Sequence, residues 1–483
     1  MTKKSWSVLG IIVIIVIAGA FLLQTREPKA SRAAGGQVVV KIWDWGVAQQ
    51  DFYDKQFEKF MEENPDIKIE HSVVNVGQYD SMLQLSMKSN NAPDIFWKPN
   101  ALSARELVEK GWAQPIDEFV TEKLKTLYPN ETFLEGVCVF DGKLYSLPVS
   151  DTRAGRLRPF YWNKKLFAEA GLDGAPKNWS QMREYAKKLT SSGAGKYYGF
   201  ILGGKNSFVW GMNVAETAAF AGNYSGEESM NYKTGKYNYD YPANIEAFEL
   251  LLTMSQDGSI FPGVMSIDDE QARAYFATNK AAMIIGGSWN VTGWQKYPNL
   301  DYGVAAIPSP DDGLKSKLIT GFPSPSWWMK KDSAHPEETW KVLEFLASLE
   351  FHRAYNAEGI GFSIIDEAKD AIVDPHMKAI EQIASEKVII GPSPVLRNPA
   401  AAQLKKYESK LPALKATFQD VLMEAWSNNG KGLEEGLRQV TKARNELMTR
   451  AIALAQKDGV KITAADWAFP DFQPLADYKM KAK

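Results

Sequence analysis

The chain has 483 residues, and its 56 Lys and Arg side chains nearly balance its 58 Asp and Glu side chains, giving a formal net charge of −2. This balance argues against a broad nucleic-acid interface, which needs a surplus of basic residues. The one cysteine, Cys138, excludes an internal disulfide and a cysteine-rich metal site. Because Cys138 lies in an apolar run, we expect an inert buried thiol. The sequence predicts neither a metal site nor a cofactor.

The first 36 residues predict a signal or anchor followed by a linker. Lys3 and Lys4 precede an uncharged run from Val8 to Leu23, and a basic flank before an apolar stretch is typical of an export signal. Ala18-Gly19-Ala20 fits a cleavage site, but the apolar run continues beyond it, so cleavage and retention as a membrane anchor both stay open. We expect the rest of the chain outside the cytoplasm, at the cell surface or in the periplasm.

From residue 37 onward, strand and helix patterns alternate. A β-prone run at 38–43 precedes apolar residues at helical spacing over 52–61, and the same order returns with a strand at 160–162 before a helix at 165–170. This alternation predicts parallel β/α layers. Two such halves predict two lobes with a binding cleft between them, lined by loops at the carboxyl ends of strands. From Ala401 the apolar spacing becomes purely helical.

Aromatic residues are numerous, with 15 Trp, 19 Tyr and 23 Phe, and several Trp lie where a predicted strand gives way to a loop. An indole offers a flat apolar face and one N–H donor. A sugar ring has an apolar C–H face and an edge of hydroxyls, so Trp beside Asp or Asn suits carbohydrate binding. The alternative for each Trp is core packing. The Trp and neighbouring polar residues concerned are Trp43, Asp44, Trp45, Trp97, Asn100, Trp210 and Trp289.

Evidence for catalysis is thin. The sequence has no GxSxG, no GxxxxGK[ST] and no complete GxGxxG motif. Carboxylates are plentiful, so a glycosidase pair drawn from Asp44, Asp94, Asp151 and Glu216 stays open. For Asp94, which precedes a short strand, capping or orienting the local backbone is the favoured role.

Short motifs in a fixed order resemble the extracellular solute-binding proteins of carbohydrate ABC transporters, the maltose-binding-protein-like family. Each motif alone is weak, but their shared order and compatible spacing are specific over about 38–365. The motifs are KIWDWG (41–46), APDIFW (92–97), FYWNKKLF (160–167), PKNW (176–179), FATNKAAMIIGGSW (276–289), GVAAIP (303–308) and HPEETW (335–340).

The resemblance implies an α/β, two-lobe periplasmic-binding-protein-like fold with an interlobe cleft and a helical C-terminal tail. We expect lobe 1 from 37–150 and about 325–365, lobe 2 from 151–324 and about 366–400, and a tail at 401–483 that packs on the lobes. It also implies ligand contacts at Asp44 and Trp45 in the first loop, Trp97 and Asn100 after the second motif, and a stacking Trp289. Asp151, Phe208 and Trp210 match the family pattern only approximately.

The function implied by the resemblance is the substrate-binding component of an ABC sugar importer. It would capture a mono- or oligosaccharide between the lobes and deliver it to the permease, as a monomer without catalysis. Two alternatives stay open: an exported carbohydrate-active enzyme that uses a carboxylate pair, and a sugar-sensing partner of a membrane receptor. The basic stretch at 151–158 indicates either a solvated hinge loop or a contact for an acidic sugar.

Overall fold

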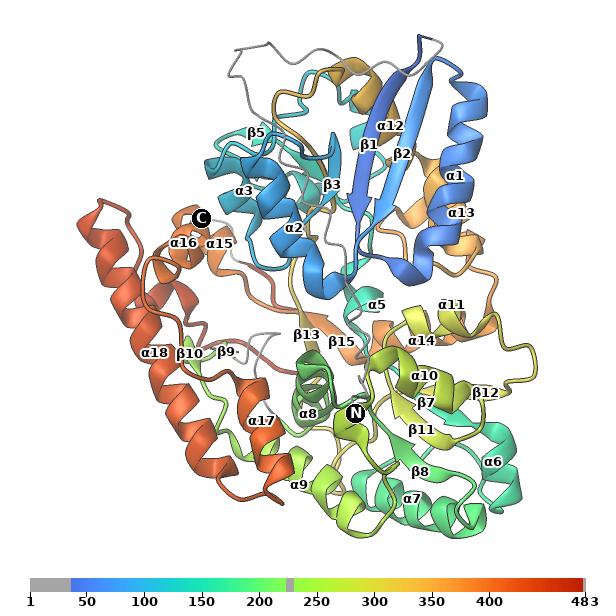
Figure 1. Ribbon diagram of the computed structural model, residues 1–483. Helices are drawn as coiled ribbons and strands as arrows, with labels where there is room; N and C mark the ends of the chain where they lie inside the picture. The colour runs from blue at the N-terminus through green and yellow to red at the C-terminus, as the bar shows by residue number, and fades with distance from the viewer. Residues whose placement is uncertain (1–35, 223–229, 481–483) are drawn as a thin grey trace, which may run out of the picture.

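Two β-sheets divide the chain into two lobes, which Figure 1 shows one above the other with a helical tail along one side. The computed structural model describes residues 36–222 and 230–480. The segment expected to be a signal or anchor lies in residues 1–35, outside the described residues. Among the helices within the described ranges, none combines the length and the apolar character needed to cross a membrane.

Lobe 1 is built on a five-stranded sheet with the order β2-β1-β3-β14-β6. Strands β1, β2 and β3 are parallel, and β14 runs antiparallel to β3 with Trp327 opposite Trp97. The β-branched start of β1 is buried on both faces, as in a central strand. The bounds are β1 Val38–Asp44, β2 Ile67–Val73, β3 Ile95–Trp97, β6 Ser146–Leu147 and β14 Trp327–Met329, with helices α1 Gln50–Glu63, α2 Val76–Lys88, α3 Ala104–Glu109, α4 Glu122–Lys125, α12 Pro336–Leu346 and α13 Leu349–Ala357.

Lobe 2 is built on a four-stranded sheet with the order β12-β7-β11-β8. Strands β8 and β11 are parallel, whereas β7 is antiparallel to both β11 and β12. The bounds are β7 Phe160–Asn163, β8 Tyr198–Ile201, β11 Ala281–Ile285 and β12 Tyr302–Ala305, with helices α6 Lys164–Glu169, α7 Trp179–Gly193, α8 Ser207–Phe220, α9 Pro242–Gln256, α10 Asp269–Ala277, α11 Trp289–Trp294 and α14 Pro375–Lys387.

Both sheets are mixed, so the prediction of parallel layers is correct only in part. β14 reaches lobe 1 directly from the hinge, without the crossover helix that a parallel neighbour needs, and it therefore pairs antiparallel. β7 enters lobe 2 from the hinge helix α5 (Thr152–Arg156) in the same way. The chain crosses between lobes at these points, and each crossing adds one antiparallel strand.

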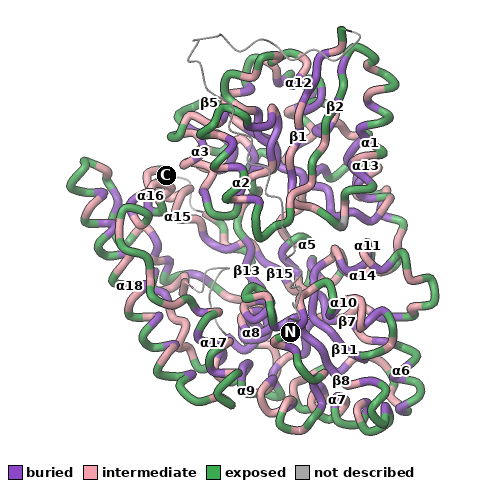
Figure 2. Tube along the Cα trace, in the orientation of Figure 1, coloured by how far each residue is buried: buried purple, intermediate pink, exposed green. Residues whose placement is uncertain are grey.

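The buried residues follow the two sheets, as Figure 2 shows. The core of lobe 1 is formed by residues from 38–149 and 327–368, and that of lobe 2 includes residues from 154–318 and 372–388. Ala368 packs in the core of lobe 1, whereas Phe362 packs in the core of lobe 2, so the two cores share the segment around the expected return at about 366. Between the lobes, β13 (Leu318–Thr320) and β15 (Val388–Ile390) form a parallel two-stranded sheet beside α5.

The helical tail contributes residues to the core of lobe 2. Phe418 and Leu422 of α17 (Phe418–Ser427) and Leu437 of α18 (Leu433–Lys457) lie in the core of lobe 2. The chain then returns to the hinge, where Phe469 and Phe472 cover Ile319 and Ile389. The tail also contacts lobe 1. Lys406 of α16 forms an ion pair with Glu109, with 2.8 Å between Nζ and Oε2. The other short elements are α15 Pro394–Arg397, α16 Leu404–Glu408, β4 Val139–Phe140, β5 Lys143–Leu144, β9 Met230–Asn231 and β10 Lys236–Tyr237.

Candidate functional site

One edge of each sheet faces the other lobe. In lobe 1 this edge is formed by the carboxyl ends of β1, β2 and β3 and by the start of β14, because Trp327 pairs with Trp97. In lobe 2 it is formed by the ends of β8 and β11 and the start of β7. The short 3₁₀ helix η1 (Val47–Gln49), which follows β1, lies against α11, which follows β11. The segments that follow β1 and β11 therefore touch across the lobe boundary.

Three indoles form a cluster at the edge of lobe 1. The ring centres of Trp45 and Trp97 are 6.3 Å apart, and those of Trp97 and Trp327 are 4.8 Å apart, with nearly perpendicular planes in both pairs. Trp45 and Trp97 are half-buried, whereas Trp327 is buried. The Tyr79 hydroxyl donates to the carbonyl oxygens of Trp43 and Trp97, and so fixes the ends of β1 and β3 against each other. Trp45 and Trp97 therefore pack against the core of lobe 1 and leave part of each side chain exposed at the ends of β1 and β3.

Asp44 forms hydrogen bonds next to this cluster. Its Oδ1 accepts the Gly46 N–H at 2.9 Å, and its Oδ2 lies 3.2 Å from Nε2 of His71. The other ring nitrogen of His71 lies 2.7 Å from Oδ1 of Asp54 on α1. Burial lowers the pKa of His71, but the hydrogen bonds and negative charges of the two carboxylates outweigh it, so the pKa is raised above its usual value. Both oxygens of the buried Asp44 are thus used to hold the loop that carries Trp45.

This arrangement predicts a pH-dependent stability. Because the pKa of His71 is higher in the folded chain, its stabilising effect is complete below the unfolded value of about 6.5 and is lost as the pH rises through the folded value. We expect the free energy of unfolding of the wild-type chain to fall over this range relative to a His71→Gln variant. Urea unfolding of both proteins across the pH series measures the difference, and parallel curves would contradict the prediction.

Trp289 and Phe208 stand at the edge of lobe 2. Trp289 begins α11 and is half-buried, and the guanidinium of Arg158 lies over its ring at 5.2 Å. A side chain on Gly287 would collide with this indole, since a Cβ there would lie 2.1 Å from the ring atom Cζ3. The Trp289 ring therefore packs against the main chain at Gly287, which has no side chain. Phe208, near the start of α8, is 47% exposed.

The structure corrects the expectation for Trp210. Its side chain is fully buried, its indole N–H donates to the Gly204 carbonyl at 2.8 Å, and its ring packs 4.8 Å from that of Trp426. Two residues along a helix correspond to a rotation of about 200°. When Phe208 points outward, Trp210 must therefore point into the core of lobe 2. Trp210 offers no surface to a solute.

Of the two predicted polar contacts, Asp151 has a structural role, whereas the Asn100 side chain is free of one within the bonds described. Asp151 caps α5, accepting the N–H groups of Arg153 and Ala154, and lies 3.4 Å from the amine of Lys369. Asn100 is exposed, and its main-chain N–H donates to Asp80 at 3.0 Å. Asp151 belongs to the hinge, and Asn100 lies in the loop after β3.

The four candidate catalytic carboxylates are each tied to other parts of the structure. Asp94 accepts the Lys41 N–H and the Ser333 hydroxyl, which confirms its role in orienting the backbone. Glu216 forms a buried ion pair with Arg156, and Asp44 and Asp151 are used as described above. Each of the four carboxylates is thus engaged by a main-chain, hydroxyl or charged partner of the protein itself. The thiol of Cys138 is buried as expected, and burial raises its pKa.

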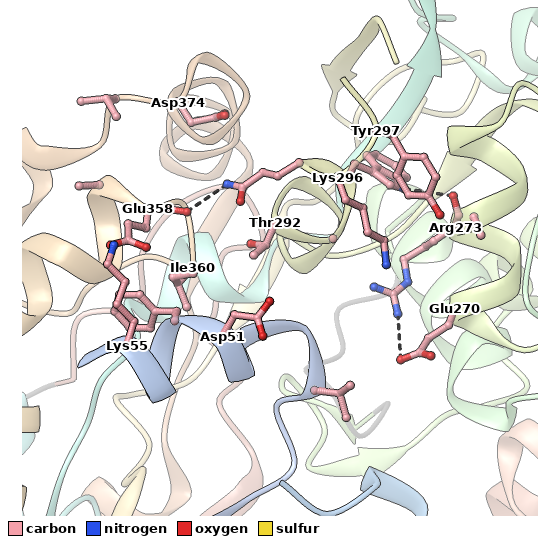
Figure 3. Close-up of a pocket in the computed structure, with 18 residues that line it drawn as sticks. Asp51, Lys55, Glu270, Arg273, Thr292, Lys296, Tyr297, Glu358, Ile360 and Asp374 are labelled. Atoms are coloured by element: carbon pink, nitrogen blue, oxygen red, sulfur yellow. Dashed lines mark hydrogen bonds and ion pairs between the residues drawn. The ribbon is translucent and has the colours of Figure 1, made fainter. Parts of the chain in front are cut away.

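A cavity of about 840 Å³ lies beside these edges, between the lobes (Figure 3). Residues of η1, α1 and the end of α13 line it from lobe 1, and residues of α10, α11 and the segments that follow α11 and precede α14 line it from lobe 2. None of the nine residues expected from the sequence lines this cavity. Its walls include Val47, Asp51, Lys55, Arg273, Thr292, Gly293, Lys296 and Glu358.

Sequence analysis missed several residues of this region. Tyr79 and His71 have no local motif, because their partners lie 18 to 36 and 17 to 27 residues away in the chain. The pair Trp327-Trp328 also lies where a predicted strand gives way to a loop, but no motif assigned Trp327 to the site. The cavity residues carry no sequence signal, because they come from elements that the fold alone brings together.

The chain resembles known proteins along most of its length. The model of the family described as bacterial extracellular solute-binding protein matches residues 46–350. A protein of Brucella abortus (strain 2308) named as a binding protein is 31% identical over 346 residues, covering 70% of this chain and 79% of that protein. The sn-glycerol-3-phosphate-binding periplasmic protein of Pectobacterium atrosepticum is 25% identical and covers 66% of this chain and 72% of that protein.

Solved structures share the fold. The maltose/maltodextrin-binding domain of Bdellovibrio bacteriovorus, bound to maltotriose, has a TM-score of 0.64 at 20% identity, covering 84% of this chain and 99% of that one. An ABC transporter solute-binding protein of Thermotoga lettingae, bound to α-D-tagatose, has a TM-score of 0.65 at 19% identity, covering 85% and 99%. The chain belongs to the family of bacterial extracellular solute-binding proteins, and it is a binding protein and not an enzyme.

Proposed function

We propose that the chain captures a saccharide between its lobes and delivers it to the permease of an ABC importer. The observation that carries this proposal is the placement of half-buried indoles on both facing edges, Trp45 and Trp97 on lobe 1 and Trp289 on lobe 2. Indole faces suit the C–H faces of sugar rings. The proteins of similar fold whose titles name maltotriose or tagatose add support.

The hinge allows the two lobes to close around a solute. A solute that contacts both lobes binds the closed arrangement more tightly than the open one, and it shifts the population by that difference in affinity. The crossing segments around α5, β13 and β15 are the connections that must bend. We also propose that the chain acts as a monomer and that residues 1–36 export it and, where they are not cleaved, anchor it to the membrane.

A thermal-shift screen tests the proposal. A ligand that binds only the folded chain raises the melting temperature, so we expect a saccharide to stand out in a panel that also contains sn-glycerol-3-phosphate. Calorimetry of the selected ligand should give stoichiometric heat without released reducing sugar. If the sugar-bound chain stimulates the ATPase activity of a reconstituted permease, the chain acts in import and not as a sugar sensor for a receptor. If only sn-glycerol-3-phosphate binds, the captured solute is a polyol phosphate and not a saccharide.

Trp289→Ala is expected to weaken saccharide binding about tenfold or more, because a lost aromatic contact is worth roughly 0.5–1.5 kcal/mol beyond the area it buries. Calorimetry measures the affinity. Trp112→Ala is the matched control, since Trp112 is also half-buried beneath a cation, Lys110 at 5.6 Å. Trp112 lies beside Lys331, past the far end of β14 and away from the facing edges. Equal losses in both variants would remove Trp289 from the site.

A further inference from the structure

We propose that His71 is a positioning residue for solute capture: as an imidazolium it ties Asp44 to Asp54, the two ends of segment 44–54, and the chain binds its solute more tightly when His71 carries a proton. This inference rests on the proposed function and adds a proton as a regulator of the same site. A neutral His71 would leave one end of the segment untied.

Both ring nitrogens of His71 face carboxylates. Nδ1 lies 2.7 Å from Oδ1 of Asp54, and Nε2 lies 3.2 Å from Oδ2 of Asp44. A neutral imidazole has one donor and one acceptor nitrogen, whereas an imidazolium has two donors. Since an ionised carboxylate only accepts, both contacts are hydrogen bonds only when the ring is protonated. The imidazolium therefore joins the end of β1 to α1.

His71 is the group that changes its charge in this cluster. Burial lowers its pKa, but the two carboxylates, one from β1 and one from α1, outweigh burial. The rings of Tyr53 and Phe57 on α1 cover the imidazole, with centres 6.1 and 5.1 Å from it. Burial raises the pKa of Tyr53 well above its usual value, and burial and the charge of Asp44 do the same to Tyr79 of α2. Both phenols therefore stay neutral where imidazole titrates.

Segment 44–54 contributes to the site and to the contact between the lobes. Trp45 belongs to the indole cluster of lobe 1, and η1 lies against α11 of lobe 2. Near the far end of the segment, Asp51 and Lys55 of α1 line the cavity between the lobes (Figure 3). A loosened segment would weaken these contacts, so a solute that both lobes hold selects the tied arrangement.

Burial decides which bond is lost when His71 gives up its proton. The side chain of Asp44 is 4% exposed, whereas that of Asp54 is 44% exposed. A buried carboxylate that lacks a donor costs more free energy than one that water can solvate. The remaining N–H therefore stays with Asp44, and the lone pair of Nδ1 then faces Asp54. Asp54 turns to solvent, and α1 loses its tie to β2.

The sign of the coupling follows from linkage. The pKa of His71 is higher in the tied segment than in the loosened one, so capture takes up a proton. Affinity is greatest below the pKa of the loosened segment, near the unperturbed value of about 6.5, and falls as the pH rises through the pKa of the tied segment. Each unit between the two pKa values corresponds to about a tenfold change in the dissociation constant.

Hydrogen exchange of the full chain without solute measures the tie directly. Gly46 N–H donates to Asp44 at 2.9 Å, and Gln49 N–H donates to the Gly46 carbonyl at 2.8 Å. After correction for the intrinsic effect of pH on exchange, we expect the protection of these amides to fall about tenfold between about pH 5.5 and about pH 9. In His71→Gln, whose side chain does not titrate, the protection should not depend on pH.

Calorimetry over the same pH range measures the effect on capture, with maltotriose, α-D-tagatose and sn-glycerol-3-phosphate as probes. The dissociation constant of the probe that binds should rise about tenfold with pH in the wild type and stay constant in His71→Gln. Asp54→Asn keeps an acceptor but removes one charge, so the rise should move to lower pH.

His376→Gln is the matched control in lobe 2. His376 also has a carboxylate neighbour, Asp374, with 3.5 Å between Nδ1 and Oδ1, but its Nε2 lies 3.2 Å from a main-chain carbonyl, that of Tyr302. It therefore does not join two carboxylates. We expect His376→Gln to keep the pH dependence of the wild type in both measurements.

The outcomes separate the two proposals. If a probe binds but its affinity does not depend on pH, or if His71→Gln keeps the dependence, the positioning role is wrong while capture stands. If only sn-glycerol-3-phosphate binds, saccharide capture fails, and the pH series with that probe decides the role of His71. If no probe binds at any pH, both proposals fail. If His71→Gln does not fold, as judged by thermal unfolding, the shift in Asp54→Asn decides the question.

Discussion

Trp210→Ala is expected to lower the free energy of unfolding by about 3–5 kcal/mol, the usual cost of truncating a fully buried Trp. The side chain has no exposed surface and packs between Phe248 and Trp426, with ring centres 6.4 and 4.8 Å away. Its removal leaves a cavity and also an unpaired Gly204 carbonyl. Urea unfolding measures the loss directly.

Phe208→Ala is the matched control for this loss. Phe208 is an aromatic residue of the same helix, two positions earlier and 47% exposed. Its truncation should change stability by less than about 1 kcal/mol, because surface changes rarely cost more. Similar stability losses in the two variants would contradict the assignment of Trp210 to the core and of Phe208 to the surface.

Glu216→Ala is expected to cost about 3–5 kcal/mol of stability, because it breaks a buried ion pair with the guanidinium of Arg156. Both side chains are more than nine-tenths buried, and Arg156 also donates to the Ile319 carbonyl. The pair therefore joins the hinge helix α5 to α8 and to the hinge strand β13. Chemical unfolding gives the cost, and solute titration shows whether the hinge still closes.

An exposed ion pair provides the comparison. Asp370→Ala removes the partner of Arg353, whose side chain is 47% exposed, and should cost no more than about 1 kcal/mol. Glu216→Gln keeps the shape and an acceptor while it removes the charge, so we expect an intermediate loss. A cost for Glu216→Ala no larger than that for Asp370→Ala would show that the buried pair does not stabilise the fold.

Runs rich in apolar residues made the strands predictable from the sequence. The runs at 38–43 and 281–285 appear as β1 and β11, because strands buried on both faces are mostly apolar, and Lys41 is the one charged residue in the two runs. The direction in which the strands pair was harder to predict from the sequence. β14 has an ordinary short apolar sequence, and its antiparallel pairing depends on where the chain returns from the hinge.

The site was predictable only where a strand end fixes the position of a side chain. Trp45 and Trp97 follow neighbouring parallel strands, so their proximity follows from the topology. Phe208 and Trp210 lie on a helix, and the choice between them depends on its rotation, which short-range patterns did not fix. The side chain of Asp151 caps the hinge helix, and a contact between Asp151 and a solute stays a prediction.

The insertion of α17 and α18 into lobe 2 has a consequence for how the chain matures. Residues near 420 and 437 complete a core that begins near 154, so the second lobe cannot finish assembling until the ribosome has made nearly the whole polypeptide. Contacts of such long sequence separation form slowly. A nascent chain that lacks them can complete the core of lobe 1 but not that of lobe 2.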